Sequence, residues 1–271
     1  MKAIIRFLTF MALFSCSSGV FSVAANANIL ITPTRIVFED RDRFAVVTLV
    51  NNGSTVKSYE MDWIHFNEGD NGDAVMQMEK AFDLSDHIVF SPRRVTLEPG
   101  AKQKIRLALR RPETIPDGDY SVHFRFHALP DPIVVQEPGQ EKKMEASIKI
   151  NVSYTIPVVL RVGEARVTAD IGQINMSRNN DTGALNVHIP VTRADGPYAI
   201  LGWLKVFHET KNGEELVGEV SNAHIFADMT QRDFVVPLKK ELSGGGRLRI
   251  VLRYYDLDTD VIYAEKVFPL E

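Results

Sequence analysis

The sequence predicts an all-β protein in which two β-sandwich domains follow one another after a cleaved signal peptide. Short runs of alternating apolar and polar residues recur along the chain, and Gly, Asn, Asp and Pro separate them. No window of about 11 residues or more shows helical periodicity, so antiparallel strands are favoured over alternating helices and strands. The first residues show the basic, apolar and small-residue succession that is typical of secretory signals.

The signal peptide is predicted at residues 1–27. Lys2 and Arg6 give a positive start, and residues 7–14 form an apolar run that is too short to span a bilayer. Small residues follow and end in an A-x-A cleavage site at residues 25–27. We therefore expect the mature chain to begin directly after this site, as a soluble exported protein.

Cys16 is the only cysteine of the chain. A lipid anchor on Cys16 is an alternative, because residues 13–16 loosely match a bacterial lipoprotein box in which Phe14 takes the place of the usual small residue. After cleavage at the A-x-A site no cysteine remains, so no disulfide is expected in spite of the oxidising compartment. The 31 Lys and Arg against 35 Asp and Glu argue against a nucleic-acid-binding protein, which would carry a basic excess.

The first half of the mature chain consists of strand-length alternating runs bounded by turn formers. The expected strands are residues 44–50, 58–66, 95–97, 103–109 and 119–128. Turns are expected at Asn51-Asn52-Gly53-Ser54 and at Glu98-Pro99-Gly100. The residues expected to point inward are Tyr59, Met61, Trp63, Tyr120, Val122, Phe124 and Phe126.

The alternating pattern lapses at residues 130–143, where three prolines and a run of charge predict a long loop. It returns in a strand from Met144 that we expect Pro157 to close, and Gly163-Glu164 marks the expected hinge. The predicted domains are residues 28–161 and 162–271. The candidate strands of the second domain are residues 184–192, 199–207, 215–226, 232–238, 247–255 and 261–268.

No motif for catalysis or for a metal stands out. His123 and His127 are four residues apart, which on a strand places them about 13 Å from each other, too far for two ligands of one zinc ion. With Arg125 they are expected to form a polar outer strip. The aspartates of residues 256–260 lack the glycine and the distal glutamate of a calcium loop. Without a G-x-S-x-G motif or a cysteine in the mature chain, the sequence predicts neither an enzyme nor a cofactor.

Two features indicate binding. The strand after the long loop is apolar at every second place, at Met144, Ala146, Ile148, Ile150, Val152, Tyr154 and Ile156. It is either an ordinary core strand, which covers at least the part nearest Pro157, or a strand whose leading half projects and completes a partner's sheet through main-chain hydrogen bonds. The other feature is Arg35, a lone cation in the first strand, which would bind a carboxylate in company with a second cation.

Several motifs of the first half occur together in one order. They are Thr34-Arg35-Ile36-Val37-Phe38, Asn51-Asn52-Gly53, Trp63, residues 91–100 (SPRRVTLEPG) with 103–106 (QKIR), and Tyr154-Thr155-Ile156-Pro157-Val158. In this order they resemble the periplasmic pilus chaperones, the PapD-like family of chaperone–usher systems. They span about half of the mature chain, whereas the second half shows only the general β pattern.

The resemblance implies two immunoglobulin-like sandwiches set at an angle. It also implies a chaperone that lends a strand to an unfinished pilus subunit and delivers it to an outer-membrane usher. The donor residues would be Ile148 and Ile150, flanked by Met144, Ala146 and Val152. Arg35 matches the family's arginine for the subunit's C-terminal carboxylate. The family's cleft lysine falls on Val152 or Ser153 here, so Lys149, the nearest basic residue of the strand, is the candidate for the second cation.

Two rival functions stay open. A tandem immunoglobulin-like pilus subunit or surface adhesin would share the β pattern, although pilins are usually single domains. A periplasmic hydrolase or metal protein has little support in the motifs. We expect pilus subunits and an usher as partners, without nucleic acid or membrane insertion, and an exposed apolar strand also favours self-association of the free protein.

Overall fold

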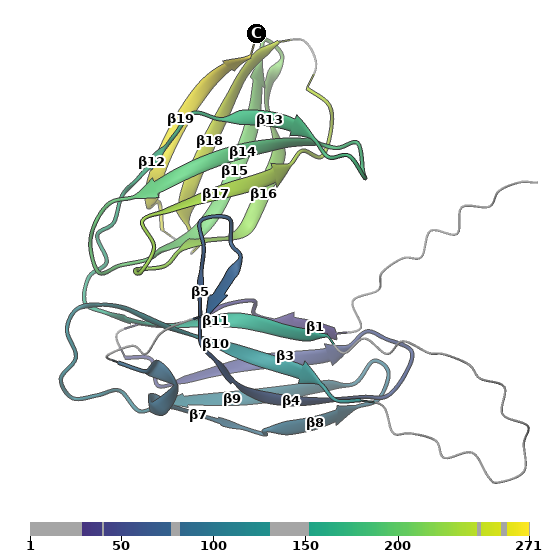
Figure 1. Ribbon diagram of the computed structural model, residues 1–271, viewed down its shortest axis with the longest axis vertical. Coiled ribbons are helices and arrows are strands. Elements are labelled where there is room, and N and C mark those ends of the chain that lie inside the picture. The colour runs from purple at the N-terminus through teal and green to yellow at the C-terminus, as the bar shows by residue number, and fades with distance from the viewer. Residues whose placement is uncertain are drawn as a thin grey trace, which may run out of the picture.

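The computed structural model describes residues 29–39, 41–76, 82–130, 152–242, 245–255 and 259–270. In these residues the chain forms β-strands and one short 3-10 helix, η1 (Leu84–His87), with no α-helix. The strands build two β-sandwiches, and the first lies across the lower end of the second (Figure 1). The predicted all-β class is therefore confirmed. No helix within the described ranges has the length and apolar character that a membrane crossing requires.

The first sandwich pairs a sheet of four strands with a sheet of five. The first sheet has the order β1 (Ile29–Thr32), β3 (Phe44–Asn51), β9 (Lys102–Leu109) and β7 (Ile88–Ser91). The second has the order β2 (Ile36–Phe38), β11 (Ser153–Val162), β10 (Gly118–Ala128), β4 (Lys57–Ile64) and β8 (Arg94–Leu97). A separate hairpin of β5 (Phe66–Glu68) and β6 (Ala74–Met76) follows β4 and rises toward the second sandwich (Figure 1).

The core of the first sandwich follows the alternation of its strands. Val47 and Leu49 of β3 face Phe124 and Phe126 of β10, and all four are fully buried. Trp63 packs at 4.8 Å between ring centroids on Phe124. The inward residues predicted from sequence are buried in this core, except that Trp63 and Tyr120 are only partly buried at its margin. Burial of alternate side chains thus selects the register of each strand.

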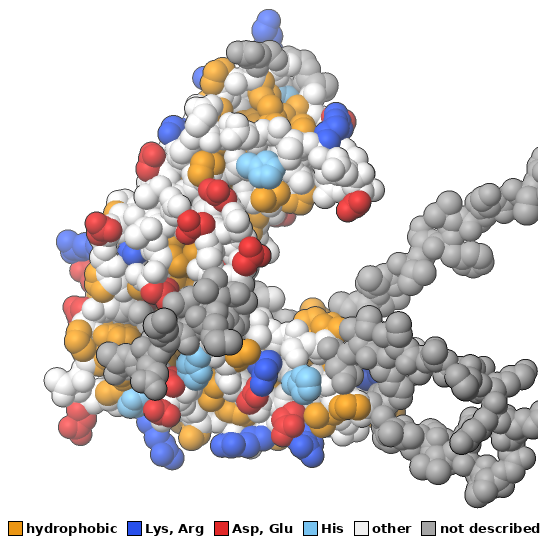
Figure 2. All heavy atoms as spheres, viewed as in Figure 1, with side chains coloured by type: hydrophobic (Ala, Val, Ile, Leu, Met, Phe, Trp, Pro, Cys, Tyr) orange, Lys and Arg blue, Asp and Glu red, His pale blue; other side chains and the backbone are white. Residues whose placement is uncertain are grey.

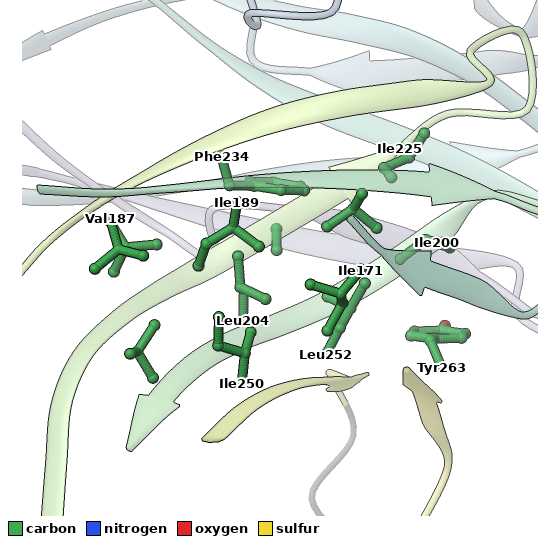
Figure 3. Packing of buried hydrophobic residues seen from close by; sticks show 14 of the residues in the cluster. Ile171, Val187, Ile189, Ile200, Leu204, Ile225, Phe234, Ile250, Leu252 and Tyr263 are labelled. Atoms are coloured by element: carbon green, nitrogen blue, oxygen red, sulfur yellow. The ribbon is translucent and has the colours of Figure 1, made fainter. Parts of the chain in front are cut away.

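The second sandwich has two sheets of four strands. One contains β12 (Ala169–Ile171) and β13 (Asn175–Arg178), which pair with the same edge of β14 (Leu185–Arg193), and β17 (Gln231–Pro237) on the other edge. The other has the order β16 (Gly213–Ile225), β15 (Ile200–Thr210), β18 (Gly246–Tyr254) and β19 (Ile262–Leu270). Side chains of both sheets, among them Ile189, Leu204 and Ile250, converge between them (Figure 3).

Strand β11 belongs to both cores. Ile156, Val158 and Leu160 point into the first core, while Val159, on the opposite face, is fully buried in the second core. Val37 of the neighbouring β2 also packs against the second core. The second sandwich therefore covers the outer face of β2 and β11.

Two expectations from the sequence are wrong. Pro157 does not close its strand, because β11 continues to Val162 and Pro157 pairs in register with His123 of β10. A proline is tolerated where its missing N–H would point to an unpaired edge. His123 does not belong to a polar outer strip: it is 4% exposed and its ring packs edge-on against Phe226 of the second sandwich.

Candidate binding site between the two domains

One edge of β11 is only partly paired. β10 pairs along the first edge from Ser153 to Val162, whereas β2 pairs along the second edge at Val158, Val159 and Leu160. In the part of the chain that the structure describes, no strand pairs with the second edge between Ser153 and Pro157. An unpaired edge presents main-chain N–H and C=O groups that can bind an added strand.

Arg35 stands at the end of this free edge. β2 runs parallel to β11 with Ile36 opposite Val158, so the register places Arg35 next to Pro157, where the unpaired stretch begins. The Arg35 guanidinium donates through Nη2 to the side-chain oxygen of Asn222 and, at 3.2 Å, to the carbonyl oxygen of Ala223. Both acceptors lie on β16, so Arg35 bridges the two domains.

The Arg35 guanidinium is incompletely satisfied. Its Nε and Nη1 atoms are buried and have no hydrogen-bond partner among the described residues, and no carboxylate there forms an ion pair with it. Its planar group lies over the ring of Tyr255, 5.7 Å from the centroid. Burial lowers the pKa of Arg35 to about 10, and the nearby charge of Arg161 acts in the same direction. A protonated guanidinium with free N–H groups in such surroundings favours an anionic acceptor.

Arg161 of β11 is the second cation at this junction, and it is fully engaged. Its Nε and Nη2 atoms donate to the two carboxylate oxygens of Asp119 at 2.9 and 2.7 Å, and Asp119 is its cross-strand partner on β10. Burial opposes the charged form, but the hydrogen bonds and charge of Asp119 raise the pKa of Arg161 above its usual range. Asp119 also accepts from the backbone N–H of Ala199, at 2.8 Å. This pair therefore joins the domains and leaves no free donor fork for a ligand.

A second cluster joins the domains around Glu68, at the end of β5. One oxygen of Glu68 lies 2.5 Å from Nη1 of Arg232 and 2.8 Å from Nε2 of His224, and its other oxygen lies 3.8 Å from Nε2 of His123. The Glu68 side chain is 11% exposed. Burial disfavours its charge, but the hydrogen bond from His224 and the neighbouring charge of Arg232 outweigh burial and hold the pKa of Glu68 well below its usual range.

The hinge between the domains borders a cavity of about 550 Å³. Glu39, Arg161, Tyr254 and Tyr263 are among its lining residues, and Arg35 is not. The cavity thus lies beside the saturated arginine, not at the free donors of the unsatisfied one. No group of three or more His, Cys, Asp or Glu within the described ranges is arranged to hold a metal ion.

The structure describes two of the seven predicted site residues, Arg35 and Val152. Arg35 lies at the domain junction. Val152, directly before β11, is 45% exposed, and its carbonyl accepts from the backbone N–H of Ala128 at the end of β10. Five of the predicted site residues lie outside the described residues, namely Met144, Ala146, Ile148, Lys149 and Ile150. Their roles as donor strand and second cation stay predictions.

Sequence reasoning missed most of the residues that join the domains: Asp119, Arg161, Glu68, His224 and Arg232. Arg161 carried one usable signal, because it lies just before the predicted hinge, whereas Asp119 is 42 positions away from Arg161 in the sequence. Glu68 is 156 positions from His224 and 164 from Arg232, and these three residues carried no such signal.

No family model matches the chain, and no curated protein matches it. Solved structures of similar arrangement include several chaperones. The chaperone DraB of E. coli is 14% identical, with a TM-score of 0.43 over 90% of this chain and 97% of that one. The chaperone CupB2 of Pseudomonas aeruginosa is 10% identical, with a TM-score of 0.42 over 89% and 100%. A Salmonella enterica complex of the SafA pilin with the SafB chaperone is 10% identical, with a TM-score of 0.43 over 89% of this chain and 96% of that one.

Proposed function

We propose that this chain is a periplasmic chaperone that binds pilus or fimbrial subunits by strand complementation and delivers them to an outer-membrane usher. In this proposal residues 28–161 form the domain that lends the strand, and residues 162–271 form the second wall of the binding cleft. No chemistry on the substrate is required, so the chain acts by binding and not as an enzyme.

The observation that carries the proposal is the position of Arg35 at the end of the free edge of β11. A partner strand that pairs with residues 153–157 continues the line of β2 and reaches Arg35 at its end. If this strand runs parallel to β11, as β2 does, its C-terminus meets the Arg35 guanidinium. The buried and unpartnered Nε and Nη1 atoms then find a carboxylate acceptor.

The predicted donor residues extend this edge toward the N-terminus. Val152 has the same parity as Tyr154 and Ile156, and it stands opposite the last residue of β10, so the strand direction at this point leads beyond the sandwich. Side chains at Ile148 and Ile150 would fill an apolar groove of the subunit, at about 0.8 kcal/mol for each buried CH₂ group. The usher would later replace this strand with one from the next subunit.

The test is co-purification from the periplasm with pilus subunits expressed beside the chain. We expect the unmodified chain to retain a subunit, Arg35→Ala to retain less, and Ile148→Asp with Ile150→Asp to retain none. Circular dichroism of each purified variant checks that it is folded. Equal retention by all three would overturn the proposed binding mode. Cell fractionation separates the rival function, since a tandem pilus subunit or surface adhesin would leave the periplasm for the cell surface.

A further inference from the structure

A short segment of β16, residues 222–224, forms hydrogen bonds with two separate residues of the first domain. Arg35, directly before β2, donates to the Asn222 side chain and to the Ala223 carbonyl. One residue further, Nε2 of His224 lies 2.8 Å from Glu68 of β5. Nδ1 of His224 lies 2.9 Å from the backbone carbonyl oxygen of Asn222. Glu68 and Arg35 are therefore connected through three consecutive residues of one strand.

The Glu68 end of this connection is held firmly. Arg232 of β17 donates to Glu68 and, at 3.3 Å, to the backbone carbonyl of His224. The β5–β6 hairpin that carries Glu68 is fixed to the same strand, because the Asp70 carbonyl accepts from the backbone N–H of Asp233 at 2.8 Å. Both the carboxylate and the strand segment that it contacts are thus restrained by β17.

The Arg35 end of the connection decides which donors are free. Only Nη2 is used by Asn222 and Ala223, so the orientation of the planar guanidinium, and with it the direction of Nε and Nη1, depends on where these two acceptors stand. Asn222 is a neutral acceptor. A carboxylate at this position would form an ion pair with Arg35 and compete with any carboxylate of a ligand.

We infer that Glu68 and Asn222 are positioning residues for Arg35: Glu68 fixes residues 222–224 through His224, and the Asn222 side chain orients the Arg35 guanidinium for a ligand carboxylate. This inference rests on the proposed function, in which Arg35 binds the C-terminal carboxylate of a partner strand. Neither Glu68 nor Asn222 touches the ligand in this arrangement. A preorganised donor fork loses less conformational freedom on binding than a mobile one.

The test uses two dye-labelled peptides in which valine alternates with serine, one with a free C-terminal carboxylate and one with a C-terminal amide. Fluorescence anisotropy gives the ratio of their affinities, which isolates the contribution of the carboxylate from that of the strand. For the unmodified mature chain we expect a preference for the carboxylate of about tenfold, the size of one charge-assisted hydrogen bond. Arg35→Ala should reduce the ratio to about one.

In Glu68→Gln we expect the ratio to fall to about threefold, and in Asn222→Asp to about one, with the amide peptide bound as before. Asp70→Asn is the matched control, because Asp70 lies on the same hairpin and accepts from Gln231 of β17 at 2.6 Å but has no bond to residues 222–224. Its ratio should stay at about tenfold. In the Arg35→Ala background, Glu68→Gln should have no further effect on the ratio.

The outcomes separate the inference from the proposed function. An unmodified chain without a preference for the carboxylate overturns the anchoring role of Arg35 and the inference with it. A preference that is lost in Arg35→Ala but unchanged in Glu68→Gln and Asn222→Asp overturns the inference alone. Should Glu68→Gln fail to fold by circular dichroism, the ratio for Asn222→Asp still decides, since this substitution keeps the shape of the side chain and replaces only a neutral amide by a carboxylate at a part-buried position.

Discussion

Arg161 and Arg35 are two arginines at the same junction between the domains, and they differ in what surrounds the guanidinium. Asp119 binds the Arg161 fork with both carboxylate oxygens, and the pKa of Arg161 is raised. Arg35 has only neutral acceptors on one nitrogen, its other two nitrogens are unpartnered among the described residues, and its pKa is lowered to about 10. A buried charge with its own counter-ion holds a fold together. A buried charge without one is maintained at a cost that a ligand can relieve.

The largest expected effect concerns the satisfied pair. Arg161→Met leaves the Asp119 carboxylate, 2% exposed, without its counter-ion. We expect the free energy of unfolding in urea to fall by about 3–5 kcal/mol, as for other buried pairs that lose one partner. Combining Arg161→Met with Asp119→Leu should recover much of this loss, because no uncompensated charge remains. A single variant as stable as the unmodified chain would show that the pair does not hold the junction.

Arg193 is a third arginine for this comparison, and it donates to backbone carbonyls, whereas Arg161 donates to the carboxylate of Asp119. Arg193 donates to five backbone carbonyls, those of Ala194, Gly196, Tyr198, Ala227 and Met229. They belong to two loops, and the Pro197 carbonyl of the first loop accepts from the backbone N–H of Asp119. Arg193→Leu should lower the free energy of unfolding by about 2–3 kcal/mol, since buried carbonyls lose their donor.

Arg193→Lys provides the control for this prediction. A lysine ammonium keeps the charge but cannot reach five acceptors with the geometry of a planar fork. In urea denaturation, the free energy of unfolding of Arg193→Lys should lie between that of the unmodified chain and that of Arg193→Leu. An Arg193→Lys variant as unstable as Arg193→Leu would mean that the shape of the fork, and not the number of bonds, is what the loops require.

The strands could be predicted from the sequence, but the junction could not. Alternation of buried and exposed positions predicted β3, β10 and, in the second domain, β14 to β19 to within a few residues, because one face of each strand lies on a core. The short strands β12 and β13 were not predicted. The same reasoning placed His123 in solvent. Its parity is that of the outer face, as predicted, but the second domain covers that face, and alternation within one strand carries no information about a second domain.

The candidate site could be predicted only in part, because it too depends on contacts between the two domains. Arg35 was found through the motif that surrounds it, whereas its unpartnered state depends on Asn222, which is 187 positions away in the sequence. β11 can continue through Pro157 because β2 pairs with this edge of β11 only at Val158, Val159 and Leu160. The alternation of apolar and polar residues did not show where β2 begins. Contacts between distant segments decide these features, and local patterns do not encode them.

The Glu68 cluster gives the junction a pH dependence. Burial lowers the pKa of His224, and the hydrogen bond to Glu68 works against this effect. The groups that face His224 are Glu68 from β5 and Arg232 from β17, and His123 from β10 lies across Glu68. Below about pH 6.5 the unfolded chain binds a proton on this histidine that the folded chain does not yet bind. The contribution of His224 to the free energy of unfolding is therefore fully present above that pH and is lost as the pH falls through the lower, folded pKa.

Thermal melts at a series of pH values check this sign. The melting temperature of the unmodified chain should fall as the pH drops below about 6.5, and the profile of His224→Gln should be flatter in the same window. The lowered pKa of Glu68 adds a further loss at more acidic pH, below about 4.3. Parallel profiles for the chain and the variant would assign the acid sensitivity to other groups.

The smallest expected effect on stability is at Arg35, where the same substitution that is damaging at Arg161 should be nearly neutral. Arg35→Met removes the bonds to Asn222 and Ala223, but it also removes a part-buried cation that has no counter-ion among the described residues. We expect these contributions to offset each other to within about 1 kcal/mol in urea denaturation, while the preference for a carboxylate-ended peptide disappears. A loss as large as that of Arg161→Met would mean that Arg35 holds the domains together, and that its unpartnered nitrogens are not reserved for a ligand.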